Sequence, residues 1–251
     1  MNSLLNRLSQ IETNALNSSA RSRLSPKYRH VSTLDLIGAM AHLIDVDGGR
    51  IKTKTGSLHA VEFKLRKEYS VQSYIGGDLV EPTVHIFNSY SGESALSVYF
   101  GLYRFVCMNG LVIGNGIFQA KAKHIEGPKM ISSLERLAGL VSTQLSDINQ
   151  LFSKVEQLDK HRSNQTQVEW ILDELRVPYR TYHKALDRFR HPIRQADVGT
   201  SMWQVYNRIQ EVIADPRRGN TGVLQNQKLM QLFLDLIPAE AKPAPRLRLV
   251  D

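Results

Sequence analysis

The first half of the chain alternates hydrophobic and polar positions with the two-residue period of a β-strand. In residues 58–69, the apolar side chains of Val61 and Phe63 alternate with the charged side chains of Glu62 and Lys64. Successive side chains of a strand point to opposite faces of a sheet. The pattern therefore predicts a half-buried strand with one face in the core and one face in water.

Three further segments of the same half predict a compact antiparallel sheet. Residues 82–90 form a second predicted strand, and residues 95–106 follow as a third strand or as a short buried helix. Residues 110–125 predict a β-hairpin whose turn is the Gly-Asn-Gly of residues 114–116, because Asn and Gly tolerate the positive φ that tight turns require.

The second half changes to the spacing of three and four residues that is typical of amphipathic helices. After Gly127-Pro128, apolar residues from Met130 to Leu158 follow this spacing and predict one long helix over residues 129–160. Four shorter helices are predicted over residues 164–175, 178–190, 200–214 and 223–236, and two N-terminal helices over residues 1–20 and 34–44. The helix at 34–44 is expected to have Ser32 or Thr33 as its N-cap.

These elements predict an α+β fold, in which a small antiparallel sheet region is followed by a long helix and a mainly helical C-terminal half. We divide the chain into a basic N-terminal arm (1–30), an α+β sheet region (31–127), a helical region (128–237) and a flexible tail (238–251). A chain of 251 residues is long enough to bury a sizeable core.

Composition favours an acidic partner and a reducing compartment. The formal net charge is +8, from 32 lysine and arginine residues against 24 acids, which places nucleic acid first among partners. A single cysteine excludes an internal disulfide. Apolar stretches such as residues 37–44 are shorter than the roughly 20 residues that a membrane span needs, and we see no secretory signal. We expect a cytoplasmic protein without a membrane partner.

No group of residues forms a convincing catalytic or metal site. Cys107 is expected near His85 and His124, but no nucleophile signature surrounds it, so we interpret it as a core residue beside the turn at Asn109-Gly110. An enzyme that uses Cys107 with either histidine remains an alternative. The eight histidines lack metal-ligand spacing, the Asp45-Val-Asp-Gly-Gly segment is interpreted as a turn, and no phosphate-binding loop is present. We predict neither a metal nor a cofactor.

The most informative basic segment spans residues 176–194, with six lysine and arginine residues and one acid. Arg180, Lys184 and Arg188 are four apart and are predicted to form one stripe of a helix. Such a stripe with interleaved aromatic rings suits single-stranded nucleic acid, because charge follows the phosphates while rings stack on bases. The alternative is a solvated helix face with its aromatics turned into the core. The candidate nucleic-acid-binding residues are Arg104, Arg176, Tyr179, Arg180, Tyr182, Lys184, Arg188, Arg190 and Arg194.

Two motifs carry a resemblance to a known family. The first lies in residues 84–114 and consists of Asn88-Ser89, Gly92 to Leu96, Arg104, Cys107 and Asn109-Gly110; the second lies in residues 200–213 and consists of Trp203, Tyr206, Asn207 and Glu211. Over residues 30–215 the chain resembles a family of phage- and plasmid-encoded proteins named after a domain of unknown function, number 932. The resemblance implies a mobile-element origin and no particular activity. Arg104 lies in an apolar segment, so its side chain must reach solvent, a buried carboxylate or a bound anion.

Our preferred hypothesis is a non-enzymatic nucleic-acid-binding protein of a phage or plasmid. We expect it to bind or anneal single-stranded DNA during recombination or replication, because a small sheet followed by a long helix is similar in outline to annealing proteins that work as rings or filaments. A homo-oligomer is compatible with this hypothesis. The alternative is an anti-defence or anti-restriction effector that binds a host protein through its exposed aromatics and long helix.

Overall fold

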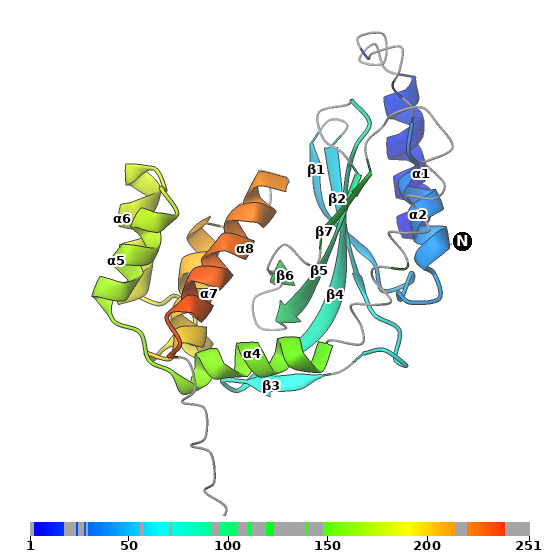
Figure 1. The fold of residues 1–251 in the computed structure, drawn as a ribbon. Coiled ribbons are helices and arrows are strands. Elements are labelled where there is room, and N and C mark those ends of the chain that lie inside the picture. Colours follow the sequence, from blue (N-terminus) through cyan, green and yellow to red (C-terminus); the bar gives the residue numbers. More distant parts are fainter. Residues whose placement is uncertain are drawn as a thin grey trace, which may run out of the picture.

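The computed structural model confirms the predicted α+β fold, with a mainly helical C-terminal half. In Figure 1 the sheet stands between the two N-terminal helices and the group of C-terminal helices. The structure describes residues 3–17, 24, 28, 30–55, 58–70, 72–91, 96–104, 110–111, 119–122, 139, 148–213 and 220–238. Within these residues no helix is long and apolar enough to cross a membrane.

The two N-terminal helices form one layer against the sheet. Helix α1 (Ser3–Leu16) buries Leu4, Leu8 and Ile11, which recur along one face. Helix α2 (Thr33–Met40) begins one residue before the predicted start, and Ser32 is its N-cap, because the Ser32 side chain accepts hydrogen bonds from the backbone N–H groups of the first turn. It ends four residues earlier than predicted, since Ile44 instead pairs with Leu65 beside the sheet.

Seven strands form one antiparallel sheet in the described part of the chain. They are β1 (Arg50–Thr55), β2 (Leu58–Lys64), β3 (Ser73–Ile75), β4 (Asp78–Ser89), β5 (Leu96–Arg104), β6 (Gly110–Leu111) and β7 (Gln119–Ala122). The strand order is β1-β2-β4-β5-β6, with β3 paired to β4 and β7 paired to β5.

The third predicted strand is confirmed as β5, so the buried-helix alternative for this segment is wrong. The predicted hairpin has a different pairing. Strand β6 pairs with Leu102 and Tyr103 of β5, and β7 pairs with β5 from Leu96 to Tyr99, so within the described residues both arms pair with β5. The expected turn at residues 114–116 lies outside those residues.

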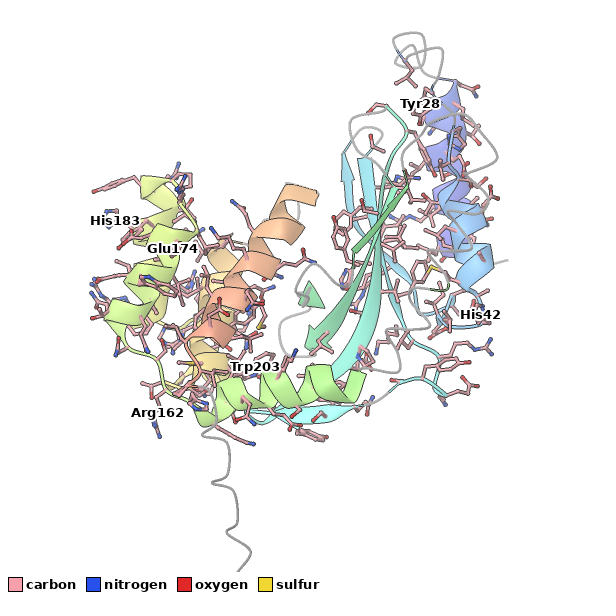
Figure 2. All side chains as sticks on the ribbon, viewed as in Figure 1. Tyr28, His42, Arg162, Glu174, His183 and Trp203 are labelled. Atoms are coloured by element: carbon pink, nitrogen blue, oxygen red, sulfur yellow. The ribbon has the colours of Figure 1, made fainter. Side chains whose placement is uncertain are left out.

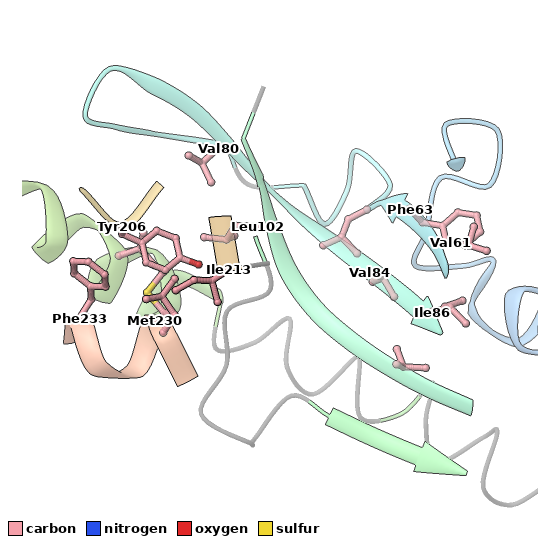
Figure 3. Packing of buried hydrophobic residues seen from close by; sticks show 14 of the residues in the cluster. Val61, Phe63, Val80, Val84, Ile86, Leu102, Tyr206, Ile213, Met230 and Phe233 are labelled. Atoms are coloured by element: carbon pink, nitrogen blue, oxygen red, sulfur yellow. The ribbon is translucent and has the colours of Figure 1, made fainter. Parts of the chain in front are cut away.

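Strand β4 is the central element because one of its faces contributes to the core along its whole length. Val84 and Ile86 pack with β2 on the side of α1 and α2, whereas Val80 lies near the C-terminal helices (Figure 3). All three belong to a single continuous hydrophobic cluster. The right-handed twist of a long strand allows one face to meet two different layers.

The opposite face of the sheet corrects a sequence prediction. The alternating pattern places Glu62 in water, but its side chain is 1% exposed, and Lys64 is only partly exposed. Glu81, Thr83 and His85 of β4 lie on this same face and are buried. Along β2 and β4 both faces of the sheet are therefore buried, and the alternation separates an apolar face from a mainly polar one.

The predicted short helices of the C-terminal half are confirmed. The structure contains α4 (Ile148–Lys160), α5 (Gln165–Glu174), α6 (Tyr179–Arg190), α7 (Met202–Ile213) and α8 (Asn220–Asp235), with a 3-10 turn at Gln195–Asp197. Helix α4 is the C-terminal part of the long helix that we predict over residues 129–160. Except for residue 139, residues 129–147 lie outside the described part, as do the tail beyond 238, the basic run at 21–23 and Lys27 and Arg29.

The sheet and the helices meet at the turn between β3 and β4. Trp203 of α7 is fully buried there, and its Nε1–H donates a hydrogen bond of 3.1 Å to Asp78 of β4. Gly76 has a φ of +59°, and a Cβ at this position would lie 2.8 Å from the indole ring of Trp203. Ser73 of β3 also donates a hydrogen bond of 3.0 Å to Glu156 of α4. We call the contacts of Asp78 and Gly76 with Trp203, and of Ser73 with Glu156, the sheet–helix joint.

Candidate functional site

Helix α6 carries most of the predicted site residues, and it separates them into two faces. Its inner side buries Ala185 and Leu186, with Tyr182 and Phe189 packed partly against the same core. Its outer side is exposed, and His183 marks this side at the edge of the molecule in Figure 2. Pro178 precedes the first turn and makes no side-chain hydrogen bond to it.

The outer face brings together Tyr179, Arg180, His183 and Lys184. All four side chains are exposed, and Tyr179 is 80% exposed. The Tyr179 and His183 rings meet edge to face, with 4.1 Å between their centroids. We call these four residues the α6 outer surface. Asp187 is the acid on the same side, and its carboxylate lies 3.0 Å from Nδ1 of His191.

Arg188 does not continue the stripe of Arg180 and Lys184, which corrects the sequence prediction. Its side chain is 19% exposed and lies 4.0 Å from the carboxylate of Glu211 on α7. Each four-residue step turns about 40° beyond a full turn of an α-helix. Two such steps carry position 188 from the outer face towards α7.

Arg194 is also held by carboxylates of the helical half, although its side chain is 31% exposed. Its guanidinium forms an ion pair with Glu211 and lies 3.9 Å from Asp197, whose side chain is 1% exposed. Arg190 is exposed, and its Nε donates a hydrogen bond of 3.2 Å to Gln165 at the start of α5. Arg188 and Arg194 are therefore structural ion-pair partners, whereas Arg190 lies at the margin of the exposed face.

Arg208 of α7 is a buried cation that sequence reasoning missed. It donates hydrogen bonds to the backbone carbonyls of Phe189, Gly199 and Gln204, and its guanidinium lies 5.5 Å from the Phe189 ring. Burial lowers the pKa of Arg208, while the carboxylate of Asp197 acts in the opposite direction. Arg208 fixes the end of α6 and the following loop to α7. Nothing in the local pattern distinguishes it, because its neighbours along the helix face include the polar Gln204 and Glu211.

The two tyrosines of α6 have different roles. Tyr182 packs partly against the core beside α5, where partial loss of hydration and the carboxylates of Asp173 and Glu169 raise its pKa. Tyr179 presents its ring to solvent. Of the two tyrosines, Tyr179 is therefore the one that a ligand can reach, whereas Tyr182 matches the alternative of an aromatic turned into the core.

Arg176 lies in the turn between α5 and α6 and has a left-handed backbone, with a φ of 51°. Its N–H donates to the carbonyl of Asp173, and the N–H of Val177 donates to the carbonyl of Leu172. These two hydrogen bonds form the Schellman arrangement that ends many helices. The Arg176 side chain is exposed.

Arg104 is the last residue of β5 and pairs with Val80. Its side chain lies outside the described residues, as do Cys107, Asn109 and His124. His85 is described: its Nδ1 lies 3.6 Å from Glu62, its Nε2 lies 3.0 Å from the Thr83 hydroxyl, and Glu62 accepts a 2.8 Å hydrogen bond from Arg50. Lys64 forms an ion pair with Glu81. His85 and Lys64 thus belong to the charge-paired, buried face of the sheet.

Asn88 organises a buried polar network that the sequence did not predict. Its side-chain amide donates to the carbonyl of Val31 at 2.9 Å and to the hydroxyl of Thr33 at 3.0 Å. Thr33 also accepts from the Tyr90 hydroxyl at 3.0 Å and lies 2.7 Å from Nε2 of His59. Burial raises the pKa of Tyr90 to about 12, although the hydrogen bonds with Thr33 act in the opposite direction.

A surface cavity of about 430 Å³ lies at the end of α2, lined by Ala41, Ile44, Asp45, Val46, Asp47, Leu65, Arg66, Lys67 and Glu68. The backbone N–H of Gly48 donates to Asp45, as expected for a turn. Charges of both signs surround the cavity, so it does not select an anionic ligand. No group of three or more metal-ligating side chains occurs in the part of the chain that the structure describes.

The residues of the second family-like motif lie on α7 and form hydrogen bonds and ion pairs inside the protein. Trp203 binds Asp78, the Tyr206 hydroxyl donates to Asn226 at 2.6 Å, and the Asn207 amide donates to the carbonyl of Trp203 at 2.7 Å. Glu211 pairs with two arginines, as described above. Trp203, Tyr206 and Glu211 connect α7 to other elements, whereas the Asn207 bond lies within α7. The four residues do not gather at an exposed site.

Comparison with known proteins identifies the family of the chain. No solved structure matches it. A family model described as "Domain of unknown function (DUF932)" matches residues 21–234, which span the sheet and almost the whole helical half. The chain therefore belongs to the DUF932 family.

Proposed function

We propose that this protein binds nucleic acid, with single-stranded DNA as the favoured ligand, through the α6 outer surface. The observation that carries the proposal is the 80% exposed ring of Tyr179 on the same helix face as Arg180 and Lys184. We further propose a cytoplasmic protein of a phage or plasmid, active in recombination or replication.

The two cations of this surface are available to phosphates. Arg180 and Lys184 form no ion pair and no side-chain hydrogen bond within the described residues, in contrast to Arg188 and Arg194. A net charge of +8 adds a general attraction for polyanions. The positive end of the α6 dipole lies beside Arg180 and adds to this attraction.

The exposed ring favours a single strand over a duplex. Bases of a single strand can leave their neighbours and stack on a protein ring, whereas bases of a duplex are already stacked and paired. Tyr179 is held by its edge contact with His183, so its orientation is restricted before a base arrives. Binding of this kind needs no catalytic group: cations hold the backbone while the ring holds a base.

The test is fluorescence anisotropy of a labelled single-stranded oligonucleotide at several salt concentrations, with a duplex as competitor. We expect binding that weakens steeply with salt and prefers the single strand. Arg180→Glu/Lys184→Glu should weaken it strongly and reduce the salt slope by about 0.7 for each phosphate that the variant no longer neutralises. Tyr179→Ala should cost about 1–3 kcal/mol of binding free energy, with little change in the salt slope.

Lys154→Glu/Lys160→Glu on α4 is the matched control, because both lysines are exposed and the net charge changes equally. We expect this variant to retain most of the binding. Negligible binding of the unmodified protein at low salt would contradict the proposal. Equal losses in the two double variants would show that net charge, and not the α6 outer surface, governs binding.

A further inference from the structure

Arg176 occupies a backbone position that normally belongs to glycine. It is the residue after the end of α5 in a Schellman arrangement, where the chain turns into the left-handed region. A residue with a Cβ is strained there, because the Cβ approaches the neighbouring carbonyl oxygen. Among the described residues, Arg176 is the only non-glycine residue with positive φ.

The fold itself does not account for an arginine at this position. The Arg176 side chain is exposed and makes no hydrogen bond or ion pair within the described part of the chain. The two hydrogen bonds that close the turn use only backbone atoms, so glycine would form them equally well. The packing of the turn comes from Leu172, which is buried, and Val177, which packs against the same core.

The position of Arg176 relates it to the α6 outer surface. It precedes Tyr179 by three residues and Arg180 by four, and the turn leads directly into the first turn of α6. Of the side chains in this turn, Arg176 alone combines a positive charge, exposure and a strained backbone. A guanidinium can bind a phosphate with two parallel hydrogen bonds, which a neutral residue in the same turn cannot do.

We infer that Arg176 holds a backbone phosphate of the strand whose base stacks on Tyr179, and that the protein keeps this contact at the expense of stability. The inference rests on the proposed function of the α6 outer surface. It adds that the binding surface extends back into the α5–α6 turn. It also predicts opposite effects of one substitution on folding and on binding, which a purely structural arginine would not show.

The test compares Arg176→Gly with the unmodified protein in thermal unfolding and in oligonucleotide binding. Arg176→Gly should raise Tm by about 1–4 °C, because glycine relieves the left-handed strain. It should weaken binding at low salt roughly threefold to tenfold and reduce the salt slope by about 0.7. Arg176→Asn, which tolerates the same backbone without the charge, should weaken binding to the same degree.

Two controls separate the side-chain contact from net charge and from strain. Arg176→Lys keeps the charge and the strain but not the two parallel hydrogen bonds, so Tm should stay unchanged and binding should weaken less than in Arg176→Gly. Lys154→Gln removes one exposed charge from α4 and should leave the salt slope unchanged.

A higher Tm together with unchanged binding and an unchanged salt slope in Arg176→Gly would overturn the inference while the proposed function stands. An unchanged or lower Tm in Arg176→Gly would overturn it as well, because the strain would then be absent. Failure of the unmodified protein to bind the oligonucleotide at all would instead overturn the proposed function and, with it, this inference.

Discussion

Buried polar side chains connect elements that lie far apart in the sequence, as Asn88 does with Thr33 and Trp203 with Asp78. Asn88 belongs to a motif visible in the sequence, but its role in joining the residues around the start of α2 to the sheet depends on Thr33, more than 50 positions earlier. The alternating pattern of strand β2 places Glu62 in water, but Glu62 is buried. Its burial comes from the fold as a whole and not from the strand. Local patterns identify which residues share a face, and tertiary contacts decide whether that face is wet.

At the residue scale, Glu12 makes the N-terminal layer sensitive to acid. Its carboxylate forms an ion pair with His30 and accepts a hydrogen bond of 3.1 Å from Ser32. Burial raises the pKa of Glu12, but the contacts with His30 and Ser32 and the nearby His59 outweigh it, so the pKa lies below its ordinary value of 4.5. The charged form is therefore favoured by folding.

The stabilisation from Glu12 is present above about pH 4.5 and is lost as the pH falls through the lower folded-state pKa. Glu12→Gln should therefore be less stable than the unmodified protein at neutral pH, and the difference should shrink below this pH. Urea unfolding between pH 3 and 7 measures this difference in the free energy of unfolding. Glu174→Gln, at an exposed position, should show no such change. A difference that stays constant with pH would contradict the assignment.

At the scale of elements, the helices were predicted well because each buries one local stripe of apolar residues. The strands β1 and β3 were missed, since Arg50–Thr55 is mostly polar and Ser73–Ile75 is only three residues long. Of the candidate binding residues on α6, spacing correctly placed Arg180 and Lys184 on one exposed face. It did not identify the side occupied by α7, so Arg188 was assigned to the wrong face.

Two glycines in different elements should respond oppositely to alanine. Gly38 is an exposed position inside α2 with open space where an alanine Cβ would lie, so Gly38→Ala should stabilise the protein by about 0.5–1 kcal/mol. Gly76 has positive φ and lies against Trp203 and Asp159, so Gly76→Ala should cost about 2 kcal/mol or more. Urea unfolding of both variants gives the two free energies, and effects of the same sign would contradict this reading of the sheet–helix joint.

At the scale of the whole molecule, the cations fall into two sets: those with a partner inside the protein and those exposed to solvent. Partly exposed cations of the helical half and of the polar sheet face are paired with carboxylates, as in Arg194 with Glu211 and Lys64 with Glu81. The buried Arg208 is held by backbone carbonyls instead. Cations of the α6 outer surface are unpaired within the described residues. The total of +8 was available from the sequence, but only the structure shows which charges a ligand can use.

The two tryptophans of the chain give the sheet–helix joint an optical signal of its own. Trp170 on α5 is 41% exposed, whereas Trp203 is fully buried at the joint. In a Trp170→Phe chain, the remaining indole should emit at short wavelength and resist quenching by iodide, because water cannot reach it. Emission at long wavelength, or ready quenching in the folded protein, would contradict the buried position of Trp203. With that variant, a stopped-flow fluorimeter can follow the separation of the sheet from the helices in real time, without an added dye.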